Sequence, residues 1–221
     1  MSAGPSRPLR ARSATEKSRR RDDILQAAER LWTAGVYTDL SMSQVAQEAR
    51  LAKGTLYLYF DTKEELFLAL LTDHLRTWLQ ELHTLLQDRR PQQPAEITAT
   101  LLQSIQGKEN LRRLLLLLNT VLARRLSPQT LLNFRRDLRH PYESVLSLLP
   151  CRPATSRLIL GHFYALSSGW QHVADDYSFP GDTSSNWVVE GAFPYDEQFK
   201  LALEAAITRL MEQDAQTEAR A

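Results

Sequence analysis

The segment from Lys53 to Phe60, KGTLYLYF, carries hydrogen-bonding side chains at a spacing that suits a short helix. At about 100° per residue, Leu56 and Phe60 fall on one side of that helix, where they would face a core. Tyr57 and Tyr59 fall on its two flanks. Phenolic hydroxyls placed there could donate to phosphates on both walls of a DNA major groove, which is about 12 Å wide. We therefore expect Tyr57 and Tyr59 to hold the DNA backbone, although tyrosines at helical spacing are also common in protein cores.

The opposite face of the same helix carries Gly54, Thr55 and Leu58. A glycine inside a helix costs about 1 kcal/mol relative to alanine, so its presence suggests that another molecule approaches the backbone closely there. DNA is the obvious candidate. Leu58 is apolar, and we hypothesise that it contacts a thymine methyl group. Together with Lys53, these residues form the expected DNA-facing surface.

Ser41 and Lys63 stand at two further predicted helix starts. Ser41 is the expected N-cap of one helix, with Gln44 returning the bond in a capping box, and its hydroxyl could also bind a phosphate. Thr62 and Glu65 predict a second capping box. Lys63 lies in the first turn of that second helix, where a cation opposes the helix dipole unless an anion is nearby. We therefore expect Lys63 to bind a phosphate.

Arg19, Arg20 and Arg21 follow a basic segment, residues 1–18, that contains almost no large apolar side chain. Such a segment cannot bury enough surface to order itself, so we expect residues 1–18 to be a disordered basic arm. Two interpretations of the three arginines stay open. They bind a DNA minor groove or phosphates, or they belong to a solvated tail.

Short helices must position these residues. Apolar spacing from Ile24 to Trp32 predicts a first helix beginning at Arg19, which Gly35 would end in a left-handed conformation. A second helix from Ser41 to about Arg50 and a third from Lys53 to about Phe60 follow, with only two or three residues between them. Short helices joined by so tight a turn are typical of a helix-turn-helix.

The rest of the chain is predicted to be helical as well. An amphipathic helix from Thr62 to about Leu85 is long enough to bridge two domains. Beyond the breaker segment at 89–94, apolar spacing predicts helices near 95–106, 109–126, 128–149, 154–176 and 195–213. Pro141 should kink or divide its helix, and residues 177–194 form a long loop. The sequence therefore predicts an all-α fold: a three-helix helix-turn-helix domain at 19–64, joined by the long helix to a larger helical domain within 65–221.

Residues 41–66, SMSQVAQEARLAKGTLYLYFDTKEEL, closely resemble the DNA-binding signature of the TetR family of transcription regulators. The resemblance implies a sequence-specific regulator of double-stranded operator DNA, most often a repressor that a small-molecule effector releases from a palindromic operator. A regulator without a physiological ligand is the alternative. The resemblance also implies common DNA contacts at the positions matching Ser41, Lys53, Gly54, Thr55, Tyr57, Tyr59 and Lys63.

Two positions depart from the family pattern. Arg50 stands at the turn position that is usually glycine, and a non-glycine residue in a left-handed conformation is strained. Ala52 stands where a serine or threonine usually precedes the recognition helix, and the loss of an N-cap hydroxyl costs about 1 kcal/mol. Arg50 could instead add a phosphate contact.

The second domain offers polar and aromatic residues that could line an effector cavity. The leucine run at 114–118 is apolar all round a helix, which favours a buried central helix over a site. A small apolar or aromatic effector is the expected ligand class. The candidate cavity residues are Asn119, Phe134, His140, Tyr142, Phe163, Tyr164, Ser168, Trp170 and Gln171.

The resemblance also implies a homodimer, because one helix-turn-helix makes too few base contacts for strong selectivity. Members of the family usually pair their last two helices across the dimer. The matching interface candidates in this chain are Gly161, Ala165, Gly169, Leu201, Ala205 and Leu210.

Composition and motifs argue against other classes. The net charge is only +1, with 27 basic and 26 acidic residues, and the single cysteine, Cys151, indicates a reducing interior and hence the cytoplasm. No hydrolase, metalloprotease or phosphate-loop motif occurs, and His162 and His172 are spaced too far apart for two ligands on one helix face. We therefore expect no enzyme activity, cofactor, metal or membrane span. A helical protein that binds partners or membrane surfaces through its basic arm is the competing interpretation.

Overall fold

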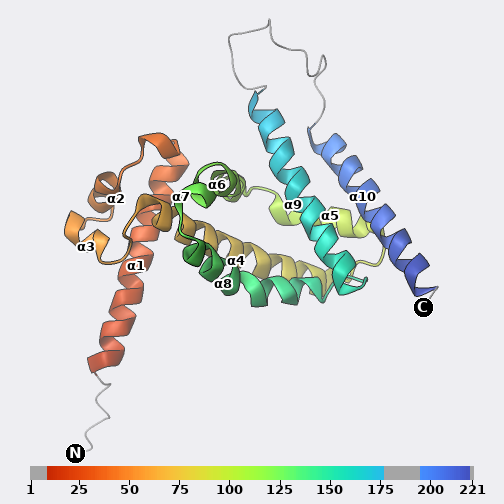
Figure 1. Cartoon of the computed structure of the whole chain (residues 1–221), viewed down its shortest axis with the longest axis horizontal. Helices are drawn as coiled ribbons and strands as arrows, with labels where there is room; N and C mark the ends of the chain where they lie inside the picture. Colours follow the sequence, from red (N-terminus) through yellow and green to blue (C-terminus); the bar gives the residue numbers. More distant parts are fainter. Residues whose placement is uncertain (1–8, 177–194, 220–221) are drawn as a thin grey trace, which may run out of the picture.

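The computed structural model of the chain describes residues 9–176 and 195–219. All secondary structure in these ranges is helical, which confirms the predicted fold class. Figure 1 shows a small group of helices, α1 to α3, at one end of the molecule and a larger helical group at the other, with α4 running between them.

Helix α1 (Leu9–Ala34) begins well before Arg19, so the prediction of a disordered arm is wrong for residues 9–18. This stretch is rich in alanine, arginine and lysine, which favour helix, and extending a helix from a packed turn costs little per residue. Residues 1–8 lie outside the described ranges. Gly35 also differs from expectation, because its φ is not positive and α1 instead ends as the chain passes through an extended Val36.

The helix-turn-helix consists of α2 (Met42–Glu48) and α3 (Lys53–Tyr57), preceded by the 3-10 turn η1 (Tyr37–Asp39). The predicted capping box at Ser41 is present, since Ser41 Oγ accepts from the Gln44 amide and the Gln44 side chain accepts from the Ser41 amide. Helix α3 is shorter than predicted. The amides of Tyr59 and Phe60 nevertheless still bond to the Leu56 carbonyl, so the chain continues to turn as far as Phe60.

Helix α4 (Lys63–Arg89) joins the two groups of helices and packs against α1 as well as against α5 and α8. Only half of its predicted capping box forms. Thr62 Oγ1 accepts from the Glu65 amide, but the Glu65 carboxylate accepts from the amide of Asp61 rather than that of Thr62. Phe67 of α4 packs edge-on against Trp32 of α1, with ring centroids 5.5 Å apart, and fixes the start of α4 in the DNA-binding domain.

The predicted helix at 109–126 is divided into three segments: α6 (Glu109–Leu117), a π-helical turn η2 (Leu118–Leu122) and α7 (Ala123–Arg125). It follows α5 (Pro94–Ile105). The leucine run is buried on one side only, since Leu114 and Leu117 are in the core while Leu115 and Leu116 are half-buried. Part of this run therefore stays available to line a cavity.

Helix α8 (Pro128–Leu146) begins at Ser127, whose hydroxyl accepts from the Thr130 amide. It passes through Pro141 without dividing, so of the two outcomes predicted for this proline, a kink or a division, the division does not occur. Proline removes one backbone hydrogen bond, and burial of Val145 and Leu146 in the core compensates for that loss.

Helices α9 (Pro153–Asp176) and α10 (Tyr195–Glu218) lie side by side, as Figure 1 shows in light and dark blue. The buried carboxylate of Asp214 on α10 accepts from the amide and the guanidinium of Arg152 and from the hydroxyl of Thr155, at the start of α9. These bonds tie the two helices together at one end. The predicted loop at 177–194 lies outside the described residues.

Candidate DNA-binding surface and effector cavity

Helix α3 presents the side chains that the helical spacing predicts. Leu56 is fully buried and Phe60 is 6% exposed, whereas Leu58 is 77% exposed and Tyr57 is 41% exposed. Leu58 and Tyr57 are therefore available to contact another molecule. The same surface includes Gly54, where an added Cβ would meet no atom within 4 Å, so packing within the described chain does not require a glycine there.

The other candidate contacts of α3 differ from one another in their exposure. Lys53 is exposed, and its ammonium lies 6.0 Å from the centre of the Tyr57 ring. Thr55 is half-buried. Tyr59 is also half-buried and packs against the hydrophobic core, so its ring has a structural role whatever its hydroxyl contacts. Tyr57 is therefore the freer of the two tyrosines.

Two helix-start groups have partners within the chain. The hydroxyl of Ser41, besides capping α2, lies 2.7 Å from the Gln44 side-chain oxygen. Lys63 donates from Nζ to the carbonyls of Tyr37 and Leu40, at 2.9 Å each, and lies 3.9 Å from the centre of the Tyr37 ring. These bonds explain a lysine at a helix start without a phosphate. No local sequence signal indicates them, because the carbonyls belong to a turn more than twenty residues away.

The burial of Lys63 and Tyr37 has electrostatic consequences. Burial lowers the pKa of Lys63. Burial, and then the nearby Glu64 carboxylate, raise the pKa of Tyr37. Arg125 of α7 donates to Glu64 at 3.0 Å, so this corner of the DNA-binding domain is also linked to the second domain.

The three arginines of α1 differ from one another. Arg19 is exposed, Arg20 forms an ion pair with Asp23 at 3.7 Å, and Arg21 reaches Asp73 of α4 at 3.4 Å. Arg21 also lies over the Phe60 ring, so it links α1, α4 and the end of the recognition segment. Of the three, Arg19 is the most available to DNA.

The turn between α2 and α3 contains the two departures from the family pattern. Arg50 adopts a φ of 55°, the left-handed conformation that glycine adopts without strain. Ala52 occupies the N-cap position of α3 and makes no side-chain bond to the helix. The left-handed conformation of Arg50 and the missing N-cap bond of Ala52 are thus both present in the structure.

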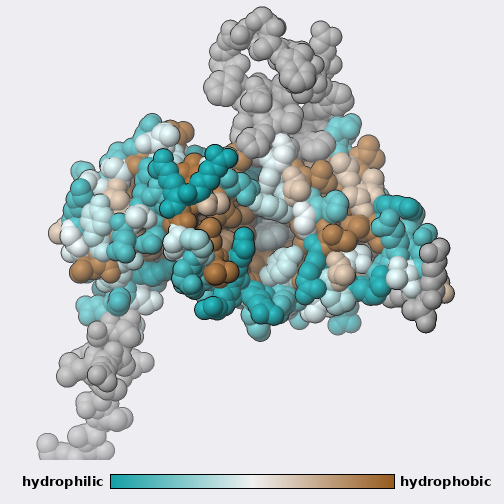
Figure 2. Space-filling model, viewed as in Figure 1, coloured by the Kyte–Doolittle hydropathy of each residue, from teal (hydrophilic) through white to brown (hydrophobic). Residues whose placement is uncertain are grey.

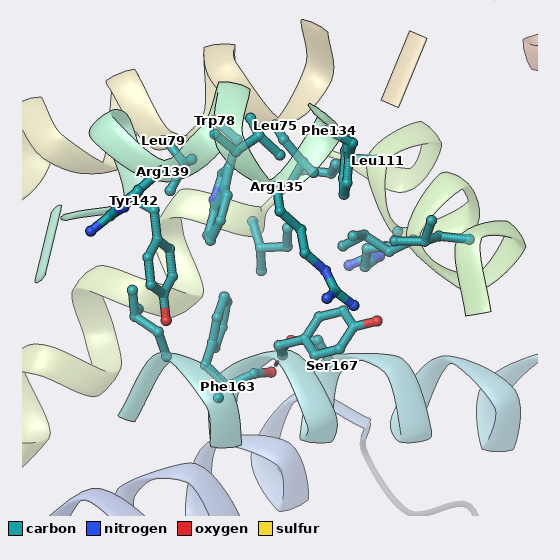
Figure 3. A pocket seen from close by; sticks show the side chains of 18 of the residues that line it. Leu75, Trp78, Leu79, Leu111, Phe134, Arg135, Arg139, Tyr142, Phe163 and Ser167 are labelled. Carbon is teal, nitrogen blue, oxygen red and sulfur yellow. Dashed lines mark hydrogen bonds between the residues drawn. The ribbon is translucent and has the colours of Figure 1, made fainter. Parts of the chain in front are cut away.

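The second domain contains a cavity of about 760 Å³, within the usual range for small-molecule sites. It lies between α4, α6, α8 and α9 (Figure 3). Four of the candidate ligand residues line it: Phe134, Tyr142, Phe163 and Tyr164. Gly161, which we expected at a dimer interface, lines it as well.

The other candidates lie elsewhere. Asn119 does not line the cavity but donates to the hydroxyl of Tyr164, which does. His140 is exposed on α8 between the lining residues Arg139 and Tyr142, and Ser167 lines the cavity in place of Ser168. One residue along a helix turns a side chain by about 100°, which accounts for both differences. The side chains of Trp170 and Gln171 lie outside the described residues.

Sequence reasoning missed most of the cavity wall. Leu75, Trp78 and Leu79 of α4 line it, and so do the arginines Arg112, Arg135, Arg136 and Arg139. The α4 residues belong to a stripe that the apolar pattern assigns to the core. The arginines lie on helices whose orientation depends on long-range packing, so no local signal distinguishes them from solvent-exposed charges.

Helices α9 and α10 share an exposed face of small and apolar residues. Leu158 and Leu201 are 50% and 64% exposed, and Ala165 and Ala205 are exposed on the same two helices. Gly169 is also exposed, with no atom within 4 Å of an added Cβ. Figure 2 shows apolar side chains gathered over these two helices. Leu210 is instead half-buried against the core, because its nine-residue offset from Leu201 turns it to another side of α10.

The two domains are joined by a polar clamp, which we define as Glu29, Thr33, His74, Asn110 and Arg113. Asn110 of α6 donates to Glu29 at 2.7 Å and to Thr33 at 2.8 Å, both on α1. His74 of α4 lies 2.7 Å from the other Glu29 oxygen. Arg113 donates to the carbonyls of Trp32 and Gly35 and lies over the Trp32 ring.

The clamp fixes the charge of Glu29. Burial alone would raise the pKa of this carboxyl, but the bonds from His74 and Asn110 hold its pKa below the usual value. An ionised Glu29 therefore holds α1, α4 and α6 together. Within the described ranges, the clamp included, no group of three or more His, Cys, Asp or Glu could hold a metal ion, and no helix is long and apolar enough to cross a membrane.

Comparison with known proteins finds transcriptional regulators among curated proteins, solved structures and family models. Among curated proteins, an uncharacterized HTH-type transcriptional regulator of Lactococcus lactis subsp. lactis is 36% identical over 62 residues, with 28% of this chain and 32% of that protein aligned. The alignment thus spans about a third of the relative.

Solved structures extend the likeness to the whole fold. A TetR transcriptional regulator from Rhodococcus sp. RHA1 is 18% identical, with a TM-score of 0.58 over 88% of this chain and 97% of the other. FadR from Thermus thermophilus, a TetR-family repressor in complex with lauroyl-CoA, is 17% identical, with a TM-score of 0.57 over 87% and 93%.

Family models match both domains in turn. Residues 24–70 match the model described as bacterial regulatory proteins, tetR family. Residues 72–173 match the model described as tetracyclin repressor-like, C-terminal domain. With the helix-turn-helix, the bridging α4 and the helical second domain all in place, the chain belongs to the TetR family of transcriptional regulators.

Proposed function

We propose that this chain is a cytoplasmic, sequence-specific repressor that binds a palindromic operator as a homodimer and is released by a small-molecule effector. The exposed face of α3 carries the proposal, because Leu58, Tyr57 and Gly54 form a surface that no other described helix covers, while Leu56 and Phe60 anchor it to the core. A helix exposed in this way can enter a major groove.

In this proposal the exposed face of α9 and α10 pairs with the same face of a second copy. The small residues Ala165, Gly169 and Ala205 allow close approach, and Leu201 supplies apolar area. A two-fold dimer presents two copies of α3, which suits an inverted repeat. The proposed DNA contacts are Arg19, Arg50, Lys53, Gly54, Thr55, Tyr57 and Leu58. Ser41, Tyr59 and Lys63 are proposed to make further contacts at the edge of this DNA-binding surface.

Effector binding would act through α6. Leu111, Arg112 and Leu115 of this helix line the cavity, while Asn110 and Arg113 of the same helix hold α1. A ligand that favours one position of α6 therefore favours one position of the DNA-binding domain. Regulation then requires only that the ligand has different affinities for the two arrangements. The cavity favours this proposal over a regulator without a ligand.

Selection from a random pool of DNA duplexes with the full chain tests the function. We expect enrichment of one inverted repeat whose half-sites are about one helical turn apart. Recovery of a pool without any enriched sequence would contradict a sequence-specific regulator, and binding to anionic vesicles with no DNA preference would favour the membrane-surface alternative.

A further inference from the structure

The effector cavity combines apolar walls with unbalanced positive charge. Leucines, aromatic rings and one isoleucine form most of its lining, and four arginines complete it: Arg112, Arg135, Arg136 and Arg139. Its described lining contains no aspartate or glutamate. A cationic ligand would be repelled here. Arg112 and Arg139 pair with Glu109 and Glu143, but a neutral ligand would leave Arg135 and Arg136 without a counter-charge.

Arg112 has an unmet hydrogen-bonding requirement. Its side chain is only 20% exposed, and one terminal nitrogen donates to Glu109 at 3.3 Å. Its Nε is buried and has no hydrogen-bond partner among the described residues. A buried donor without an acceptor is costly, and a charged donor more so. A ligand oxygen at this position would supply the acceptor.

Arg135 provides a second positive group facing the same space. Figure 3 shows its side chain reaching from α8 into the cavity, toward α9 and Ser167. The acidic residues nearby on α8 are engaged elsewhere, since Asp137 pairs with Arg76 and Glu143 pairs with Arg139. Arg135 forms no ion pair with any residue that the structure describes, so its charge is available to a ligand.

The cavity adjoins another space at Arg112. A second hollow of about 450 Å³ shares Ile105, Arg112 and Ser167 with it and reaches Glu197 and Lys200 near the start of α10. Arg112 thus stands at the junction of the two spaces. A ligand's polar end can bind there while its apolar part fills the larger cavity.

The geometry points to an anionic amphiphile as the effector: an apolar chain seated among Leu79, Trp78 and Phe163, with a carboxylate or phosphate head group bound by Arg112 and Arg135. This inference rests on the proposed ligand-responsive function and names its ligand class. Guanidinium groups suit both kinds of head group because their N–H donors match paired anionic oxygens. Binding at Arg112 would act directly on α6, which carries Asn110 and Arg113 of the clamp.

Calorimetric titration of the full chain with four dodecyl compounds tests the inference: dodecanoate, dodecyl phosphate, dodecanol and dodecyltrimethylammonium. We expect the two anions to bind at least about tenfold more tightly than the alcohol and the cation to bind least, since one charge-assisted contact contributes about that factor. The stronger anion identifies the head group. Tighter or equal binding of dodecanol or the cation would overturn the inference, and so would no binding of any of the four.

Variants of Arg112 and Arg135 test where the head group of the ligand binds. Arg112→Met and Arg135→Met should each weaken dodecanoate binding about tenfold and leave dodecanol binding unchanged. Arg112→Lys, which keeps the charge, should recover part of the loss, and Arg209→Met on the exposed side of α10 is the matched control. Unchanged dodecanoate binding in both cavity variants would contradict the assignment. Ligand binding is measured without DNA, so its failure leaves the operator selection as a separate test of the proposed function.

Discussion

At the scale of single residues, the segment from Lys53 to Phe60 has a buried side and an exposed side. The burial of Leu56 and Phe60 and the exposure of Leu58 follow from turns of 100° along one helix. The capping box of Ser41 and Gln44 spans three residues and is present as expected. The intramolecular acceptors of Lys63 could not be predicted, because they become its neighbours only after η1 has folded against α4.

Replacement of Lys63 by methionine tests its structural role. We expect Lys63→Met to lower the free energy of unfolding by about 1 to 2 kcal/mol, because two carbonyl acceptors lose a charged donor. Lys53→Met is the matched control, since the Lys53 ammonium is exposed and lies 6.0 Å from the centre of the Tyr57 ring. Urea unfolding followed by circular dichroism measures both. Equal stability of the two variants would mean that Lys63 does not hold the turn.

Replacement of Arg50 by glycine separates strain from DNA binding. The left-handed φ of 55° costs about 1 kcal/mol for a residue with a side chain, so Arg50→Gly should unfold at a higher urea concentration. If the guanidinium binds a phosphate, affinity should fall equally for all DNA sequences. Arg90→Gly, at a φ of 46° at the end of α4, should give the stability gain alone. If Arg50→Gly were less stable than the unaltered chain, the left-handed conformation of Arg50 would not be strained.

At the scale of helices, their existence and order are predictable, while their interruptions depend on packing. The all-helical pattern and the bridging α4 follow from apolar spacing. The π-helical turn at Leu118–Leu122 and the continuity of α8 through Pro141 do not, because neighbouring helices decide whether a local defect is tolerated. The cavity arginines could not be predicted for the same reason, because the packing of neighbouring helices decides which side chains line the cavity.

The clamp makes α6 the predicted link between cavity and DNA. Asn110→Ala removes the bonds to Glu29 and Thr33, so we expect faster hydrogen exchange in the last turns of α1 and weaker operator binding. Hydrogen–deuterium exchange followed by mass spectrometry measures the first effect. Asn133→Ala on the exposed side of α8 is the control. Unchanged exchange in α1 would show that Asn110 does not restrain this helix.

Asp214 makes the packing of α9 and α10 dependent on pH. Burial alone would raise its pKa, but the bonds from Arg152 and Thr155 hold its pKa below the ordinary value of 3.8. The ionised carboxylate therefore contributes stability above that value, and the contribution disappears as the pH falls through the folded-state pKa. Asp214→Asn should lower the free energy of unfolding by about 2 kcal/mol at neutral pH.

The difference between Asp214→Asn and the unaltered chain should narrow below pH 3.8, as urea unfolding at several pH values would measure. Asp88→Asn, at an exposed position of α4, controls for the loss of one charge. A difference that stays constant with pH would assign the effect to packing rather than to ionisation.

At the scale of the whole molecule, the proposed function requires a two-fold dimer. Leu201→Glu places a charge in the exposed face of α9 and α10, so we expect a shift from dimer to monomer in sedimentation velocity. Operator affinity should fall at least about a hundredfold, because the two half-sites are then bound independently. Thr84→Glu, exposed on α4, is the control. A Leu201→Glu protein that remains dimeric would place the interface elsewhere.

The affinity of the full chain for its selected inverted repeat and for a scrambled duplex, measured by fluorescence anisotropy at several salt concentrations, tests the central claim most directly. We predict saturable binding of two chains per repeat, at least about 1,000-fold tighter than to the scrambled duplex, with affinity for both falling steeply as salt rises. Equal affinity for the two duplexes would contradict a sequence-specific regulator.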